Sequence, residues 1–148
     1  FTPEGMLFGH NTLYFDNPNN PQVGKDFVKW YEDKYKDYPE WEADRAYFAI
    51  ESYRLGVEKA MKAKGGSWPS QTDIIEAIPG ISVDSLGGKG GWRKDKIADQ
   101  TFVQGFSTHK NKYDFVTLST FDTMYSADLQ KPPGANFWEW IKTAKFKV

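Results

Sequence analysis

The 148-residue sequence predicts an α/β chain that forms part of a larger fold, and three observations lead to this expectation. Residues 6–15 are apolar and β-prone, as in a strand that runs out into a loop. Residues 21–78 show helical spacing interrupted by Pro and Gly, whereas the pattern after Gly80 alternates with period two. Only one strand precedes three helices, so the strands are too few to cover the apolar faces of the helices.

The first helix is expected after the Asp-Asn-Pro-Asn-Asn-Pro turn at residues 16–21. Asn20 is the expected N-cap, and Pro21 has the fixed backbone angle that suits the first helical position. The helix is expected to end before Pro39, because a residue that precedes Pro is disfavoured in the helical region. Its buried face is expected to consist of five residues at helical spacing: Val23, Phe27, Trp30, Tyr31 and Tyr35.

A second helix is expected over residues 42–64 and opens on Arg45-Ala46-Tyr47, with Gly65-Gly66 at its end. A third, short helix is expected over residues 71–78. Ser70 and Asp73 match a capping box there, in which each side chain bonds the backbone of the other residue. The apolar stripe expected to face the core from the second helix consists of Ala46, Ile50, Tyr53, Val57 and Met61.

Strands are expected over residues 81–86, 101–106 and 113–124, with a tight turn in the glycine-rich run at 87–91. That run is not expected to bind phosphate. A P-loop needs a helix after its glycines and a Ser or Thr after its Lys, and both are missing from this run.

A last short helix is expected over residues 137–143, with Asn136 as its N-cap. Trp138 and Trp140 are expected to serve in docking this helix and not as a platform for sugars. Pro132-Pro133-Gly134 separates it from the strands.

Composition excludes several functional classes. Nineteen basic and twenty acidic residues leave a net charge of −1, which offers no electrostatic case for binding nucleic acid. There is no cysteine, and the two histidines, His10 and His109, are far apart, so neither a metal site nor a cofactor is expected. No nucleophile motif or singled-out carboxylate pair is present, so no catalytic residue is expected.

The ordered series over residues 16–65 resembles the late part of the type I periplasmic solute-binding proteins of ABC importers, the branched-chain amino-acid and amide binders. The shared pattern is a D-N-P turn, a helix ending Y-x-x-K-Y, a short break, a helix opening A-Y, and an ending with A-hydrophobic-K-A-x-G. The resemblance implies an α/β fold that is the C-terminal portion of a two-lobed clamshell, incomplete on its own.

Four segments follow from this resemblance. Residues 1–14 would form a strand and a hinge crossover from one lobe. Residues 15–99 would supply the helices and the Gly-rich hairpin of the other lobe, and residues 100–128 would supply strands that cross back. Residues 129–148 would be a Pro-rich turn and a short helix.

The resemblance further implies a non-enzymatic function: capture of an amino acid, amide or related small organic solute between two closing lobes. The partners would be the missing N-terminal part of the same protein, the solute and an ABC permease in the membrane. The location would be periplasmic, or extracellular and membrane-anchored, after removal of a signal peptide from the precursor. The chain by itself is expected to bind no solute tightly, because it would supply only one wall of the cleft.

Tyr47 is the first candidate for ligand binding. The resemblance places the Tyr or Phe of the A-Y opening, here Ala46-Tyr47, at the ligand cleft. The alternative is a Tyr packed in the core with its hydroxyl satisfied. Arg45 beside it could hold a carboxylate with two parallel hydrogen bonds. The family usually has a small residue at this place, so a surface ion pair of Arg45 with Glu42 or Asp44 is the stronger expectation.

Three more candidates, His10, Asn11 and Tyr14, lie at the end of the first expected strand. In an open α/β lobe the ligand crevice lies at the carboxyl ends of strands, and these side chains suit a small polar solute. The alternative for His10 is a structural or merely exposed histidine.

Other functions remain open. The same clamshell also serves as the sensor domain of receptors, so transport and signalling are not separated by the sequence. An aromatic-rich carbohydrate-binding module would need a mostly β fold, against which the helical stretch argues. A small α/β enzyme is disfavoured because no catalytic constellation is present.

Overall fold

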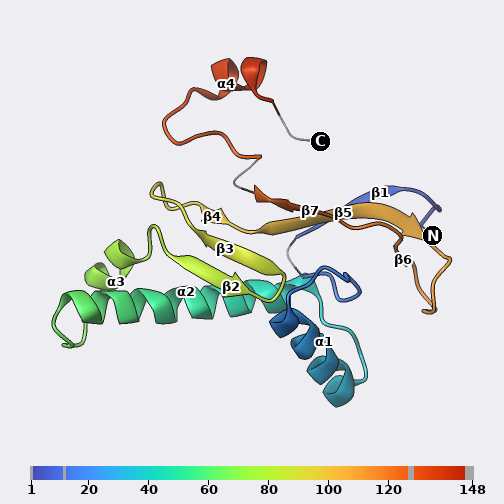
Figure 1. Cartoon of the computed structure of the whole chain (residues 1–148), viewed down its shortest axis with the longest axis horizontal. Coiled ribbons are helices and arrows are strands. Elements are labelled where there is room, and N and C mark those ends of the chain that lie inside the picture. The colour runs from blue at the N-terminus through green and yellow to red at the C-terminus, as the bar shows by residue number, and fades with distance from the viewer. Residues whose placement is uncertain (1, 12, 127–128, 146–148) are drawn as a thin grey trace.

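The computed structural model describes residues 2–11, 13–126 and 129–145, with only the backbone of Asn11 (Figure 1). It is an α/β structure, as expected. A long helix lies along a three-stranded sheet, a second sheet extends from one end of this layer, and the last helix stands apart from both (Figure 1). Within the described residues, no helix combines the length and apolar character needed to span a membrane.

The first sheet is antiparallel and consists of β2 (Ser82–Ser85), β3 (Gly88–Trp92) and β4 (Ala98–Asp99). It lies across α2 (Trp41–Ala63) (Figure 1). Burial alternates along β2 because every second side chain of a strand faces the helix layer. The alternation in the sequence therefore predicted this strand correctly.

The second sheet is built around β5 (Thr101–Thr108), which pairs antiparallel with β1 (Leu7–Asn11). The same strand pairs with β6 (Thr117–Leu118) near its end and with β7 (Asp122–Tyr125) near its start. This pairing places the beginning of the chain beside residues about a hundred positions later.

The single strand expected over residues 113–124 is wrong, because β6 and β7 are separate short strands. Leu118 pairs with Ser107, and Asp122 pairs with Gln104. Four steps on one strand therefore oppose three on the other, and the extra residue interrupts the ladder as a β-bulge does. The carbonyl of Thr120 lies over Gly105, where a Cβ atom would come within 2.0 Å of the oxygen.

The helix α1 (Gln22–Tyr35) begins without a side-chain cap, so the expectation that Asn20 caps it is wrong. Asn20 is buried, and its Nδ2 donates to the carbonyl of Tyr14 at 2.8 Å. The helix ends earlier than Pro39 requires, since Lys36 adopts a left-handed backbone and its N–H bonds to Glu32.

The apolar stripes expected to be buried are largely exposed. The fraction of exposed surface is 68% for Ile50, 55% for Tyr53 and 49% for Trp30. The described part of the chain covers one face of each helix: the β2–β3 hairpin packs on α1 and on the start of α2, and α3 packs on Val57 and Ala60. The residues buried on that face are Gly24 and Val28 of α1 and Asp44, Phe48, Ser52, Gly56, Val57 and Ala60 of α2.

The expectation of a tight turn over the glycine-rich run is wrong. Gly88 to Gly91 lie in β3, and the turn falls at Leu86-Gly87. A Cβ atom on Gly90 would come within 2.8 Å of the Phe48 ring, so the missing side chain lets α2 approach the strand closely. Strands lie on both sides of the turn, which agrees with the exclusion of a P-loop.

The two remaining helices have the expected caps. At α3 (Gln71–Ala77), Ser70 Oγ accepts the N–H of Asp73, and Asp73 Oδ2 accepts the N–H of Ser70 at 2.7 Å. At α4 (Phe137–Thr143), Asn136 Oδ1 accepts the N–H groups of the next helical turn.

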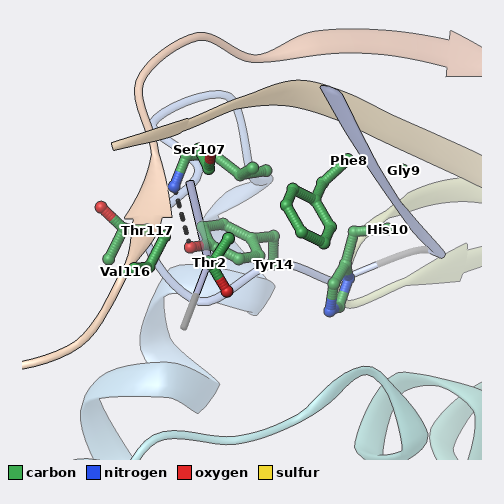
Figure 2. A pocket seen from close by; sticks show the side chains of 9 residues that line it. Thr2, Phe8, Gly9, His10, Tyr14, Ser107, Val116 and Thr117 are labelled. Atoms are coloured by element: carbon green, nitrogen blue, oxygen red, sulfur yellow. Dashed lines mark hydrogen bonds between the residues drawn. The ribbon is translucent and has the colours of Figure 1, made fainter. Parts of the chain in front are cut away.

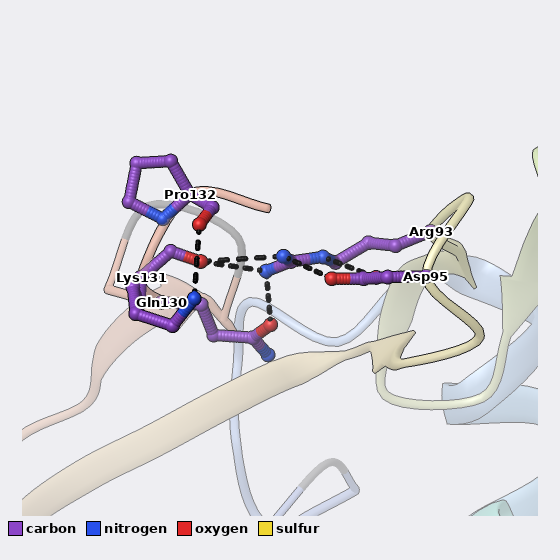
Figure 3. A network of polar contacts seen from close by, with 5 residues as sticks. All are labelled: Arg93, Asp95, Gln130, Lys131 and Pro132. Atoms are coloured by element: carbon purple, nitrogen blue, oxygen red, sulfur yellow. Dashed lines mark hydrogen bonds and ion pairs between the residues drawn. The ribbon is translucent and has the colours of Figure 1, made fainter. Parts of the chain in front are cut away.

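The segment before α4 is attached to the turn between β3 and β4 through Arg93 (Figure 3). The guanidinium donates to Gln130 Oε1 at 2.8 Å and to the carbonyl of Lys131 at 3.2 Å. Asp95 pairs with the same guanidinium at 2.6 Å. The Arg93 side chain is only 12% exposed, so this junction is partly shielded from water.

Candidate functional site

A cavity of about 460 Å³ lies between the end of β1 and the segment that joins α1 to α2. Aromatic rings dominate its lining: Tyr14, Phe15, Tyr38, Trp41 and Phe115. His10, Pro39 and Val116 complete the wall, and Asp37 and Glu40 contribute carboxylates. The volume falls within the range typical of sites for small molecules.

A second cavity of about 200 Å³ adjoins the first and shares His10, Tyr14 and Val116 with it (Figure 2). Its other lining residues include Phe8 and Gly9 of β1, Ser107 of β5 and Thr117 of β6. The rings of His10 and Tyr14 meet edge to face, with their centroids 5.2 Å apart. Both residues therefore take part in both cavities.

Tyr14 is held in place from two directions. Its carbonyl accepts the Nδ2 of Asn20 and the N–H of Asn17, and its hydroxyl oxygen accepts the N–H of Leu118 at 3.2 Å (Figure 2). Burial, together with the negative charge of Asp16, raises the pKa of Tyr14 to about 12. The hydroxyl therefore stays protonated near neutral pH, when it can donate a hydrogen bond to a solute.

Four rings in mutual contact fix the wall of the larger cavity. Phe15, Tyr38, Tyr113 and Phe115 come from three separate segments, and their centroids lie 4.5 to 6.0 Å apart in every pair. Tyr113 also donates its hydroxyl to Asp16 Oδ1 at 2.9 Å. Burial and this carboxylate raise the pKa of Tyr113. The cluster joins the β5–β6 loop to the segment between α1 and α2.

Trp41 connects this wall to the opening of α2. The Arg45 guanidinium lies over the Trp41 ring, with Cζ 4.3 Å from the centroid. Arg45 and Ala46 are exposed, and neither belongs to the lining of the two cavities. Arg45 thus stands one helical turn beyond the cavity rim.

The expected ion pair of Arg45 with Glu42 or Asp44 is wrong: Arg45 forms no ion pair with any residue that the structure describes. Asp44 is buried instead, and its carboxylate accepts the hydroxyl of Ser85 and the N–H groups of Leu86 and Gly87.

Tyr47 is half-buried and packs against the cluster of Leu13, Val28 and Leu86. In the described part of the chain its hydroxyl has no hydrogen-bond partner. Its role in a ligand cleft stays a prediction. The structure brings His10 and Tyr14 together, and the side chain of Asn11 lies outside the described part.

Sequence reasoning missed the other rings of the cavity, Phe15, Tyr38, Trp41 and Phe115. Three of them follow the first strand or flank Pro39, so the break between the helices was the available signal. Phe115 gave none. Within the described ranges, no three His, Asp or Glu side chains are grouped as they would be around a metal ion.

Several solved structures are similar to this chain, among them the following three. A branched-chain amino acid ABC transporter protein from Rhodopseudomonas palustris matches with a TM-score of 0.66 and 20% identity, over 82% of this chain and 31% of its own. A solute-binding protein of an ABC transporter from the same species, in complex with 3,4-dihydroxybenzoic acid, has a TM-score of 0.62 and 20% identity over 88% and 33%. A leucine-binding protein from Thermotoga maritima has a TM-score of 0.57 and 22% identity over 80% and 31%.

The chain thus has the α/β fold of part of a type I periplasmic binding protein, as the resemblance implied. It spans about a third of the length of the solved structures that it matches. No protein-family model and no curated protein sequence matches it.

Proposed function

We propose that this chain is part of the solute-binding component of an ABC transporter and helps to capture an amino acid, amide or related small organic solute between two lobes. The match to transporter-associated binding proteins over 80% to 88% of the chain carries this proposal. The exposed apolar faces of α1 and α2 support it, because a larger lobe would bury them.

In this function, residues 1–14 and 100–128 are hinge crossovers, residues 15–99 belong to one lobe, and residues 129–148 are the terminal turn and helix. The antiparallel pairing of β1 with β5 supports this division, since two crossovers that run side by side can bend together. Closure on a solute then shifts a pre-existing equilibrium between open and closed forms.

The solute would contact His10, Asn11 and Tyr14 at the end of β1 and Arg45, Ala46 and Tyr47 at the opening of α2. The ring-lined cavity adjoining these residues supports this choice. The protonated hydroxyl of Tyr14 would donate a hydrogen bond, and the exposed guanidinium of Arg45 could bind an anionic group. No bond is made or broken, so the function is binding and not catalysis.

The rest of the same protein would supply the opposite wall of the cleft, and an ABC permease would recognise the closed form. The location would then be the periplasm, or the cell exterior with a membrane anchor. A ligand-sensing domain of a receptor is the second candidate, because it would use the same fold. A carbohydrate-binding module, which needs a mostly β fold, fits poorly with helices of the length of α1 and α2.

Isothermal titration of the full-length protein with leucine, other amino acids, amides and 3,4-dihydroxybenzoate tests the proposal. One of these solutes should bind at micromolar concentration or tighter, and Tyr14→Phe should weaken that binding about 3- to 10-fold by removing one hydrogen bond. The control is Tyr53→Phe, which removes an exposed hydroxyl from the outer face of α2. Failure of all solutes to bind would contradict the proposal.

A further inference from the structure

The larger cavity carries a charge pattern that its rings alone do not explain. Asp37 and Glu40 both line it, and no lysine or arginine is among the described residues of the lining. The segment between α1 and α2 therefore presents a negative rim to an aromatic wall.

These two carboxylates have no cationic partner among the residues that the structure describes. In the part of the protein that the structure describes, Asp37 and Glu40 form no ion pair. Asp37 Oδ1 accepts the N–H of Tyr38 at 2.8 Å, while the side chain of Glu40 bonds no described residue. Both residues are exposed, so their carboxylates are accessible to a cation.

The rings beside these carboxylates are suited to the same kind of ligand. The faces of Trp, Tyr and Phe attract a cation within about 6 Å of the ring centroid, and Trp does so most strongly. The Arg45 guanidinium occupies one face of the Trp41 ring, with Cζ 4.3 Å from the centroid, so an ammonium group would have to bind the other face. Tyr38, Phe15 and Phe115 are fixed against one another in the adjoining wall.

We propose that this cavity binds the ammonium group of a small organic cation, held by the rings of Trp41 and Tyr38 and by the carboxylates of Asp37 and Glu40. This inference rests on the proposed function, because it takes the cavity to be one wall of the solute cleft. The cavity volume of about 460 Å³ suits a single small molecule.

Choline and 3,3-dimethyl-1-butanol form a matched probe pair, because the second replaces the ammonium nitrogen of the first by carbon. Titrated into the full-length protein, choline should bind at least about 10-fold more tightly than its neutral isostere. Equal binding of the two, or the absence of choline binding, would overturn the inference.

Variants assign the effect to the cavity. Glu40→Gln should weaken choline binding about 3- to 10-fold, and Trp41→Leu should weaken it by a similar factor. Glu42→Gln is the matched control, because Glu42 is an exposed carboxylate of the same helical turn that does not line the cavity. It should leave choline binding unchanged. Equal losses for Glu40→Gln and Glu42→Gln would assign the effect to general surface charge and contradict the proposal.

The outcomes separate this inference from the proposed function. If leucine or 3,4-dihydroxybenzoate binds tightly and choline does not, the protein is a solute-binding protein but its cavity does not select cations. If choline binds and Glu40→Gln weakens it, both proposals are supported. Circular dichroism of each variant verifies that the fold is retained.

Discussion

The carboxylate of Asp44 accepts the backbone N–H of Leu86 at 2.7 Å, across 42 positions of the sequence. The same carboxylate accepts the N–H of Gly87 and the hydroxyl of Ser85. One buried side chain in the first turn of α2 thus accepts the hydrogen bonds of the backbone donors in the turn between β2 and β3. This contact positions the opening of α2, including Trp41 and Arg45, against the sheet.

Replacement of this carboxylate should destabilise the protein strongly. Asp44→Ala leaves two buried N–H groups without an acceptor, and we expect a loss of about 2 to 4 kcal/mol in the free energy of unfolding. Urea denaturation followed by circular dichroism measures it. Glu42→Ala, on the exposed side of the same turn, should change stability by less than about 0.5 kcal/mol. Similar losses for both variants would contradict the role given to Asp44.

Gly24→Ala should also be destabilising, although alanine normally favours a helix over glycine by about 1 kcal/mol. A Cβ atom at this position would come within 2.0 Å of the backbone oxygen of Leu86, and the backbone must shift to admit it. We expect a net loss of about 1 to 3 kcal/mol in the free energy of unfolding, measured by urea denaturation.

Gly56→Ala is the control for this effect. There the nearest atom to the added Cβ is the Ile78 Cγ1 at 2.8 Å, and a side chain can rotate away. Its loss should be clearly smaller than that of Gly24→Ala, and the reverse order would disprove the packing argument.

Tyr113→Phe should weaken the attachment of the β5–β6 loop by removing the hydrogen bond to Asp16 while keeping the ring in its cluster. We expect a loss of about 1 to 2 kcal/mol in the free energy of unfolding. Amide hydrogen exchange should become faster in residues 109–116. Tyr53→Phe, which removes an exposed hydroxyl, serves as the comparison and should change neither quantity. Unchanged exchange in Tyr113→Phe would show that the rings alone hold the loop.

Alkaline pH should destabilise the protein through Tyr14. Its pKa is raised from 10.0 to about 12, chiefly by burial. A raised pKa in the folded state means that the stabilisation is fully present below pH 10 and is lost as the pH rises from 10 toward 12.

The urea midpoint should therefore fall over this pH range, and it should fall less steeply in Tyr14→Phe than in the unmodified protein. Tyr53→Phe should follow the unmodified protein. Identical pH profiles for Tyr14→Phe and the unmodified protein would contradict this account. Absorbance of phenolate near 295 nm reports the titration directly.

The sequence predicted elements whose signals are local. The capping box of Ser70 and Asp73 and the cap at Asn136 involve residues within three positions, so their partners could be read from the sequence. Asn20 was assigned wrongly because its partner is the carbonyl of Tyr14, six positions back in the preceding loop. A residue type that suits a cap does not specify which acceptor it will find.

The expected buried stripe of α2 was wrong at Ala46, Ile50 and Tyr53, which are exposed, and right at Val57, and the reason is physical. Periodicity showed that Ile50 and Tyr53 share a stripe, but the packing of the hairpin decides which face is covered. The hairpin covers the face with Phe48, where a Cβ atom on Gly90 would come within 2.8 Å of the ring, and α3 covers Gly56 through Ile74 and Ile78. Hydrophobic pattern alone does not locate such an approach.

The candidate site was predicted in part. His10 and Tyr14, which the sequence placed at the end of the first strand, line both cavities of the candidate site. The cavity itself needed Phe115, which reaches Phe15 only because the chain returns after a hundred residues. The sequence contained no local sign of that contact.

The hydrogen bonds of Arg93 limit how far α4 can travel. Six residue steps separate the anchored carbonyl of Lys131 from Phe137, and an extended chain of that length spans about 20 Å. The start of α4 must therefore lie within about 20 Å of this anchor at the β3–β4 turn. A surface that binds Trp138 must therefore also lie close to the β3–β4 turn.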